Sequence, residues 1–519
     1  MTEYVVAVDV GTESARAGVF DAKGSLLGKY TSDMVLDRPE AGRGEYDSED
    51  IWRCVCRSVR AALEEVGAKP ADVAGISFDA TCSLVLRKPD GGQLPLREES
   101  GNRFDTIAWF DHRAVAEAEE CTATGHEVLN YVGGVMSPEM EVPKLMWIKR
   151  NRPEIWNGAG YFFDLCDFLT WRASGANNRS VCALACKWTY LGHSEDPWKQ
   201  DFLDTVGISD MLERGNLPDR ASDVGAAIGP LSSVAAKELG LTTSCKVVIG
   251  LIDAHAGAIG TIGAMPRDSF DEHLALIAGT STCVMALSPE PRLIPGVWGP
   301  YLDAVLPGLW LNEGGQSATG ALLDYVLESH GRPKTDHGRI TGIIERKLED
   351  DPDFAKRLHV VPDHHGNRSP LADPQAVGVV SGLTLDASED ALAALYYKSA
   401  LGIAYGLRHI VEEMNENGYS LNTLHVAGGH TKNPLLMQFY ADATLCTVVS
   451  AGAEDGVLLG TAVVAAGGCG LHSDLYSAAA AMVPKGRPQS PNFANVEKHA
   501  HGFAVMRRMQ AHRAEIDAL

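Results

Sequence analysis

The sequence predicts an α/β protein of two domains, and two observations lead to this prediction. The chain has 519 residues, which is too long for one hydrophobic core and suits two domains of about 250 residues. It also contains one pattern twice, at 4–20 and 274–287: an apolar strand, a turn of glycine and hydroxyl residues, and a second strand. We place the boundary between residues 1–262 and 263–519, where Met265 to Asp268 breaks the pattern.

The first turn has the composition of an anion-binding loop. It follows the buried strand Tyr4 to Val8, and a glycine here lets backbone N–H groups approach a phosphate. Asp9, at the strand end, is placed to hold Mg²⁺. The alternative is an ordinary hairpin with a polar turn, and the second copy of the pattern favours phosphate binding over it. The candidate phosphate contacts are Gly11, Thr12, Ser14 and Arg16 in the first copy and Gly279, Thr280 and Ser281 in the second.

Apolar periodicity predicts the other main elements in order. Apolar residues at helical spacing from Ile51 to Val66 predict a helix that Asp47 or Ser48 caps and Gly67 ends. Strands follow at 73–78 and 247–251, then a long core helix at 392–414 and a strand at 424–426. Further helices are predicted to begin at Asn433-Pro434, to cover 457–466, and to follow Gly502.

Composition excludes several classes of function. A hydrophobic content of 45% and a charged content of 22% are those of a globular protein, and a net charge of −23 argues against a nucleic-acid or membrane-surface partner. The N-terminus lacks the features of a signal peptide, and no apolar run is long enough to span a bilayer. The 11 cysteines are expected to be buried free thiols rather than a disulfide or metal framework, so we predict a cytoplasmic protein.

Three motifs invite a wrong interpretation. Residues 257–263 have the spacing GxxGxxG instead of the dinucleotide fingerprint GxGxxG, so we predict a helix whose small residues pack against the sheet. His364 and His365 lack a third ligand and are expected in a surface turn. Cys182 and Cys186 lack a second cysteine pair to complete a zinc site.

The repeated turn is similar to the phosphate-binding plan of actin-like (ribonuclease-H-like) ATPase domains, and this resemblance implies two such domains flanking a central cleft. The wider set of motifs resembles the FGGY carbohydrate kinases over nearly the whole chain, and within them the ribulokinase-like pentulose kinases of the D-ribulokinase type. Glu141, at the start of one motif, departs from the family pattern. The motifs are Asp9 to Thr12, Trp109 to Arg113, Pro143 to Trp147, Asp253 to His255, Gly279 to Ser281, Gly314 to Ser317, Gly366 to Pro370 with Asp373-Pro374, and Gly428-Gly429.

The resemblance implies ATP and Mg²⁺ as cofactors and gives roles to particular residues. Asp253, after the strand 247–251, corresponds to the general base of the family. In such a kinase Asp9, the carboxylate at the strand end, would organise Mg²⁺ with Thr12 nearby. The remaining nucleotide contacts implied by the resemblance are Gly428 and Gly429 beside the adenine, together with Gln316 and Asn433.

The resemblance also implies a sugar pocket, with an alternative for most of its residues. Lys187 and Glu313 match ketose-binding positions of L-ribulokinases, although a lone lysine is usually a solvated surface residue. Trp109 and Asp111 offer an aromatic face and a carboxylate to a sugar, while Asp111 with Arg113 could equally form a structural ion pair. For Asp79 and Thr81, at the end of the strand 73–78, the alternative is simple turn chemistry.

These observations predict an ATP-dependent kinase that converts D-ribulose to D-ribulose 5-phosphate, with Asp253 as both base and substrate contact. L-ribulose and D-xylulose are the alternative substrates, and a homodimer is the oligomer considered. An alternative from another class is an ATP-switched binding module of the actin or heat-shock type. Such a module has no use for the group Thr81, Lys187, Asp253 and Glu313, which therefore favours the kinase.

Overall fold

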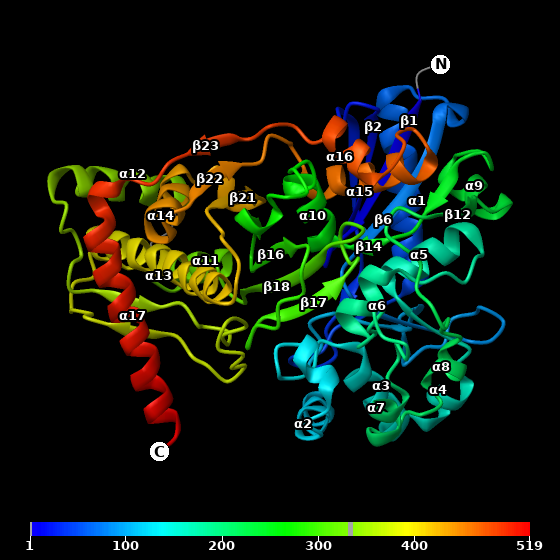
Figure 1. Ribbon diagram of the computed structural model, residues 1–519, viewed down its shortest axis with the longest axis horizontal. Coiled ribbons are helices and arrows are strands. Elements are labelled where there is room, and N and C mark those ends of the chain that lie inside the picture. Colours follow the sequence, from blue (N-terminus) through cyan, green and yellow to red (C-terminus); the bar gives the residue numbers. More distant parts are fainter. Residues whose placement is uncertain (1–2, 331–335) are drawn as a thin grey trace.

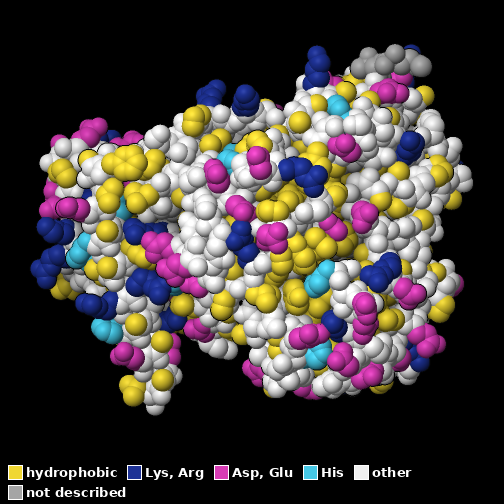
Figure 2. Space-filling view, in the orientation of Figure 1, with side chains coloured by type: hydrophobic (Ala, Val, Ile, Leu, Met, Phe, Trp, Pro, Cys, Tyr) yellow, Lys and Arg dark blue, Asp and Glu magenta, His cyan; other side chains and the backbone are white. Residues whose placement is uncertain are grey.

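The computed structural model describes residues 3–330 and 336–519. Two large mixed sheets, one in each half of the sequence, are covered by helices and lie side by side (Figure 1). In the space-filling view a notch along the lower edge separates the two halves, and on this face Lys and Arg side chains lie scattered among acidic ones (Figure 2). The predicted α/β class and the pair of similar domains are therefore confirmed.

The first sheet has the order β12-β13-β6-β1-β2-β3, with β14 beside β6. β1 pairs antiparallel with β2 and parallel with β6, and it is buried because its neighbours and the covering helices enclose both faces. The predicted hairpin at 4–20 is thus present. The strands are β1 (Tyr4–Val10), β2 (Ser14–Asp21), β3 (Leu26–Asp33), β6 (Val73–Ala80), β12 (Ala227–Pro230), β13 (Lys246–Val248) and β14 (Leu251–Ile252).

The second sheet repeats this arrangement with the order β17-β18-β16-β15-β21-β22-β23. Like β1, the strand β15 pairs antiparallel with the next strand, β16, and parallel with a later one, β21. The two halves therefore share one local topology. The strands are β15 (His273–Ala278), β16 (Thr282–Ser288), β17 (Trp298–Leu302), β18 (Trp310–Gln316), β21 (Thr423–Ala427), β22 (Thr447–Ser450) and β23 (Arg487–Gln489).

Smaller sheets extend both halves. One sheet in the first half, of order β11-β7-β10-β5-β4, carries the segment that precedes Trp109. Its strands are β4 (Leu36–Asp37), β5 (Glu45–Tyr46), β7 (Leu84–Arg87), β10 (Thr106–Ile107) and β11 (Tyr161–Asp164). Two further pairs are β8 (Arg97–Glu99) with β9 (Asn102–Phe104) and β19 (His359–Val361) with β20 (Val379–Ser381).

Helix ends follow the predicted capping residues. In α1 (Ser48–Val66) the Asp47 side chain accepts hydrogen bonds from the first turn, and Gly67 ends the helix in the left-handed conformation. Asn433 caps α14 (Pro434–Thr444) in the same way. The other helices of the first half are α2 (Val115–Ala123), α3 (Glu141–Asn151), α4 (Pro153–Gly158), α5 (Leu165–Ser174), α6 (Val181–Lys187), α7 (Gln200–Thr205), α8 (Met211–Gly215), α9 (Ser233–Leu239) and α10 (Asp253–Ile262).

The remaining helices lie in the second half of the sequence. The predicted core helix at 392–414 is the centre of α13, and the predicted tail helix is α17. Within the described residues, no helix combines the length and apolarity needed to cross a bilayer. The helices are α11 (Gly320–His330), α12 (His337–Asp350), α13 (Glu389–Glu416), α15 (Gly456–Cys469), α16 (Leu475–Met482) and α17 (Val496–Asp517).

One helix of the second half returns to the first sheet. α15 packs against β1, β6 and α10, and its side chains join the same buried cluster as those of the first half (Figure 1). The glycines of α10 serve this contact, because a Cβ on Gly260 would lie 1.9 Å from the backbone oxygen of Gly456. The predicted small-residue face is therefore real, but its partner is α15 and not chiefly the sheet.

Candidate active site

Three carboxylates meet at one edge of the first sheet. Asp9, one residue before the end of β1, lies next to Asp79 of β6 in parallel register. β14, which also pairs parallel with β6, leads directly into Asp253 at the start of α10. The carboxyl ends of parallel strands are where open α/β sheets bind ligands. We call this group of Asp9, Asp79 and Asp253 the acidic edge.

The acidic edge carries more negative charge than its surroundings balance. Burial raises the pKa of Asp9, and Arg16 only partly offsets this effect. Burial and the charge of Asp9 raise the pKa of Asp79 well above its usual value. The same two causes raise the pKa of Asp253 to about 6, which places it in the range that suits a general base near neutral pH.

The first turn directly follows the strand that carries Asp9 of the acidic edge. The backbone N–H of Gly11 donates to the carbonyl of Ser14 at 3.0 Å, which closes the turn. Thr12 accepts a hydrogen bond from the indole of Trp109 at 3.1 Å. Arg16 departs from the prediction: its Nε donates to Asp9 at 2.6 Å and its guanidinium also pairs with Asp455, so its charge is committed to carboxylates instead of standing free for a phosphate.

The second turn is built in the same way. The backbone N–H of Gly279 donates to the carbonyl of Ser281 at 2.9 Å, which repeats the closure of the first turn. Thr280 is exposed at the tip. Two backbone N–H groups at the start of α11 donate to the carbonyl of Thr280, so that helix holds the turn in place. The matching turns support the predicted phosphate contacts in both halves.

The predicted adenine contacts lie beside the second turn. Gly428 has a φ of 94°, and a Cβ there would lie 2.3 Å from the Ala278 oxygen, so only glycine suits this position. Gly429 is exposed, and a Cβ there would approach the nearest atom only to 4.0 Å. The side chains of Asn433 and Gln316 form hydrogen bonds within the protein. Asn433 caps α14, and Gln316 donates to the Ile403 carbonyl at 3.1 Å.

Lys187 and Glu313 come together in a second group of charges, although they are 126 residues apart in the sequence. Lys187, at the end of α6, lies with its ammonium 4.3 Å from the centre of the Trp298 ring. Glu313 of β18 is the register partner of Trp298 and accepts a hydrogen bond from His255 at 3.1 Å. Both charged side chains are buried, so Lys187 is not the solvated surface residue that a lone lysine usually is.

Sequence reasoning missed three residues of this group: His255, Glu139 and Arg368. Arg368 lies 3.8 Å from Glu139 and 5.7 Å from the centre of the Trp298 ring. We call Lys187, Glu313, His255, Glu139 and Arg368, around Trp298, the paired cluster. His255 and Arg368 occur in motifs that were recognised, but their role depends on neighbours that the sequence does not reveal. The adjacent His364 and His365 are exposed, as predicted.

Each carboxylate of the paired cluster has cationic partners. Burial raises the pKa of Glu313, but the hydrogen bond and charge of His255 outweigh it and lower the pKa to about 2. Arg368 and His112 lower the pKa of Glu139 to about 2 in the same way, against the effect of burial. For His255, burial lowers the pKa, whereas Cys182 and Glu313 raise it to about 10. Both carboxylates of the cluster are therefore held in preformed ion pairs, while the Lys187 ammonium lies over the Trp298 ring.

Two predicted sugar contacts are fully buried and hydrogen-bonded within the protein. Asp79 is fully buried at the acidic edge, where Thr461 of α15 donates to it, so its carboxylate does not line the paired cluster. Asp111 is also fully buried, and its oxygens accept hydrogen bonds from Arg113 and from the Gly44 backbone. The ion pair, which was the alternative interpretation of Asp111, is thus the arrangement that the structure contains. Thr81 is 7% exposed, and its backbone N–H donates to Val10 beside the acidic edge.

The duplicated sheet with two matching glycine-hydroxyl turns is the fold of the actin-like ATPases. Comparison with known proteins makes this more specific. Residues 4–260 match the N-terminal domain of the FGGY family of carbohydrate kinases, and residues 274–469 match its C-terminal domain. The chain therefore belongs to the FGGY family of carbohydrate kinases, and it is an ATP-dependent phosphotransferase.

Individual relatives cover almost the whole chain. A Xenopus laevis protein described as an FGGY carbohydrate kinase domain-containing protein is 40% identical over 543 residues, which covers 99% of this chain and 98% of the relative. A D-ribulokinase of Saccharomyces cerevisiae is 36% identical over 511 residues and covers 89% of this chain and 72% of that protein. The crystal structure of a gluconate kinase from Lactobacillus acidophilus matches with a TM-score of 0.84, at 20% identity and 98% coverage of both chains.

Proposed function

We propose that this kinase phosphorylates a ketopentose and that D-ribulose is its best substrate, giving D-ribulose 5-phosphate. The observation that carries the proposal is that Asp253, a carboxylate with a raised pKa, is followed two residues later by His255, which contacts Glu313 of the buried paired cluster. A base and, beside the same helix end, a buried cluster of donors and acceptors suit a small polyhydroxy substrate. The 36% identity to a D-ribulokinase supports the choice of sugar.

Asp253 acts as the general base in this proposal. Its carboxylate takes the proton of the primary hydroxyl, the hydroxyl oxygen forms a bond to the γ-phosphorus of ATP, and the bond from that phosphorus to the β–γ bridging oxygen breaks to release ADP. Phosphoryl transfer needs mainly positioning and charge stabilisation from the protein. Lys187 and Glu313 supply positioning, since a buried donor and a buried acceptor together fix the orientation of a sugar hydroxyl.

The two turns hold the phosphates, and the acidic edge suits a cation. Mg²⁺ prefers carboxylate oxygens and water as ligands, and among the described residues Oδ1 of Asp79 is buried without a hydrogen-bond partner. The residues present therefore fit Mg²⁺, which Asp9 would hold, with Asp79 next to Asp9 in the sheet. When bound, the ion neutralises charge on the phosphates. Gly428 and Gly429 leave room for the adenine, and the domain boundary at 262/263 remains a prediction.

The ATP-switched binding module of the actin or heat-shock type has no support, because the chain belongs to a family of carbohydrate kinases. We propose that the enzyme works in a reducing cytoplasm, which suits its 11 free cysteines. A homodimer stays a prediction that light scattering can test.

A coupled assay of ADP release tests the substrate. It compares D-ribulose, L-ribulose, D-xylulose and the matching pentitols, with Asp253→Asn as the blank that reports contaminating kinases. We expect kcat/KM to be highest for D-ribulose. A higher value for L-ribulose or D-xylulose would refute the choice of sugar and leave the kinase assignment intact, while no activity on any pentulose would refute the substrate class.

A further inference from the structure

Arg368 belongs to the paired cluster, but it lies outside regular secondary structure, in the connection between β19 and β20. The backbone N–H and carbonyl groups of Asn367 and Asp373 exchange two hydrogen bonds, at 2.8 Å and 2.9 Å. These bonds close residues 368–372 into a small loop, which we call the arginine loop. The conformation of this loop decides where the Arg368 guanidinium lies within the cluster.

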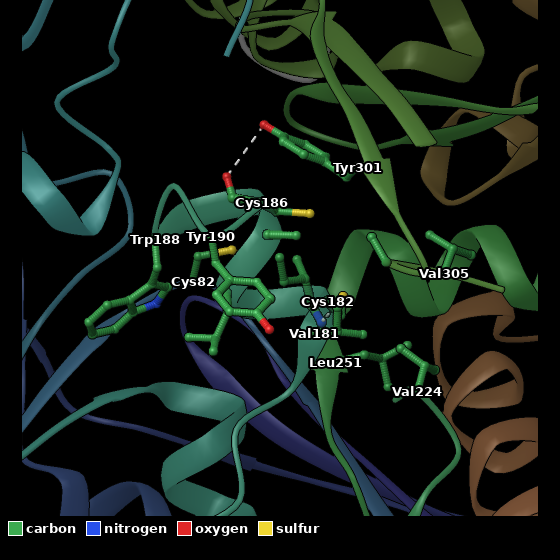
Figure 3. Close-up of a cluster of buried hydrophobic side chains, with 14 of the residues drawn as sticks. Cys82, Val181, Cys182, Cys186, Trp188, Tyr190, Val224, Leu251, Tyr301 and Val305 are labelled. Atoms are coloured by element: carbon green, nitrogen blue, oxygen red, sulfur yellow. Dashed lines mark hydrogen bonds between the residues drawn. The ribbon is translucent and has the colours of Figure 1, made fainter. Parts of the chain in front are cut away.

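Lys187, the lysine of the same cluster, is fixed in another way. It ends α6, whose residues are buried over the whole length of the helix. Figure 3 shows Cys182 and Cys186 of this helix among apolar side chains, with the hydroxyl of Tyr301 donating to the Cys186 carbonyl at 3.5 Å. Core packing therefore fixes the end of α6, whereas the arginine loop depends on other contacts.

Both ends of the arginine loop are tied to one arginine of the C-terminal helix α17. The guanidinium of Arg513 donates to Asp373 at 3.0 Å and to one oxygen of Asp363 at 3.3 Å. The other oxygen of Asp363 accepts a hydrogen bond from the Asn367 side chain at 2.9 Å. Arg513 therefore reaches one end of the loop directly and the other end through Asp363. Gln510, three residues earlier on α17, also donates to Asp363, at 3.1 Å.

The centre of this network is shielded from water. The exposed fraction is 6% for Asp363 and 5% for both Gln510 and Arg513, whereas Arg507 and Arg508 on the same helix are exposed. A buried ion pair adds little net stability, because both charges lose their water, but its partners are held in one geometry. The network therefore suits positioning of the loop more than stabilisation of the fold.

The arginine loop also touches the strand that carries Glu313. A Cβ on Gly314 would lie 3.1 Å from the hydroxyl oxygen of Ser369, so the loop packs closely against β18 beside Glu313. Nη1 of Arg368 lies 3.8 Å from the sulfur of Cys283 on β16. A shift of the loop would therefore change the surroundings of both Arg368 and Glu313.

We propose that Arg513 is a positioning residue for the sugar site: through Asp363 and Asp373 it holds the arginine loop, and with it the Arg368 guanidinium, in the paired cluster. This role rests on the proposed function, because it takes the paired cluster as the place where the sugar binds. It also gives a function to α17, which lies beyond residues 274–469 that match the C-terminal family domain.

Steady-state kinetics of Arg513→Met test this role, with the sugar of the panel that gives the highest kcat/KM. We expect kcat/KM for that sugar to fall roughly 10- to 100-fold, mainly through its KM, with a smaller change in the KM for ATP. Arg508→Met, at an exposed position of the same helix, is the matched control and should keep the wild-type constants. Because Arg513 acts through Arg368, adding Arg513→Met to Arg368→Met should cause no further loss.

A second variant keeps the proposal testable if Arg513→Met fails to fold. Asp373→Asn removes one contact of Arg513 and leaves Asp363 paired with it, so no buried charge loses its partner. We expect the KM for the sugar to rise in this variant too, but by less than in Arg513→Met. Wild-type kinetics in Asp373→Asn, together with wild-type mobility of the loop, would overturn the proposal.

Hydrogen–deuterium exchange measures the mobility of the loop without any sugar. Backbone amides of residues 366–373 should exchange faster in Arg513→Met and in Asp373→Asn than in the wild type, and Arg508→Met should not change their rate. Unchanged exchange in the first two variants would overturn the proposal, as would a loss of activity from Arg513→Met that is equally large in the Arg368→Met background. If no pentulose reacts, the proposed function fails, while exchange still decides whether Arg513 holds the loop.

Discussion

The acidic edge and the paired cluster use the same chemical group in opposite ways. At the acidic edge, Asp9, Asp79 and Asp253 are crowded together, and their pKa values are raised. In the paired cluster, each of Glu313 and Glu139 has a cationic neighbour, and their pKa values are lowered to about 2. Burial acts to raise the pKa in both regions, so the difference comes from the partners and not from burial.

This contrast shows how one chain can provide separate binding regions for two ligands of different charge. A region with surplus negative charge is ready for a cation and, with it, for the phosphates of ATP. A region whose carboxylates are already paired is ready for a neutral polyhydroxy compound, since it offers donors and acceptors that are already held in place. Changes in each region should therefore alter different kinetic constants.

The largest expected effect comes from the acidic edge. Asp253→Asn removes the base but keeps the shape of the side chain, so kcat should fall by roughly 10²–10⁴ while ATP binding stays near normal. Steady-state kinetics and calorimetry with ATP measure the two quantities. Asp268→Asn, at an exposed position before β15, is the matched control and should keep full turnover. If Asp253→Asn retains more than half of its turnover, Asp253 is not the base.

The next effect separates the paired cluster from the acidic edge. Glu313→Gln leaves Lys187 and His255 with an uncharged partner, which costs about 1–3 kcal/mol, or roughly 5- to 150-fold in affinity. We expect this loss in the KM for the sugar and little change in the KM for ATP. An equal rise of both KM values would show that the two regions are not independent.

A smaller effect is expected at the proposed adenine contact. The position of Gly429 can accept a Cβ without a clash in the protein itself, so Gly429→Val should fold and obstruct only the nucleotide. A loss of about 1–2 kcal/mol corresponds to a factor of 5–30 and should appear in the KM for ATP. Unchanged ATP affinity by calorimetry, in a variant with the wild-type melting temperature, would contradict this placement of the adenine ring.

The pH dependence of kcat/KM is a further test of the difference between the acidic edge and the paired cluster. Asp253 must be a carboxylate to accept a proton, and its pKa is about 6, so kcat/KM should fall as the pH drops through that value, roughly tenfold per unit. Glu313, whose pKa is about 2, stays ionised over the same range. The profile should therefore show one acidic limb, and Asp253→Asn should abolish it. A limb that persists in this variant would assign the titration to another group.

Local patterns made much of the fold predictable. The repeated hairpins, the caps Asp47 and Asn433 and the end of α1 at Gly67 depend on residues close together in the sequence, so a single stretch contains the needed information. The position of Asp253 after a buried strand was predictable for the same reason. These local patterns predict the strand-end positions of Asp9 and Asp253 in the acidic edge. They do not predict that Asp79 lies beside Asp9, because this contact comes from pairing between strands that are distant in the sequence.

The paired cluster was predictable only in part. Lys187 and Glu313 came from a resemblance, and their meeting required the two halves of the chain to pack together. Glu139 and Arg368 were not assigned because each is an ordinary surface residue until its partner is known. The same applies to His255, whose contacts come from α6 and β18. Charge pairing across distant segments is thus the information that the sequence does not display.

The return of α15 to the first sheet ties the two halves of the chain into one folding unit. Asp455, just before this helix, pairs with Arg16, and Thr461 donates to Asp79, so the acidic edge is completed from the far end of the sequence. A fragment that stops before residue 455 would lack both contacts and would expose apolar surface on β1 and β6. A gene split between the two family domains would therefore have to reassemble both products before either could form this edge.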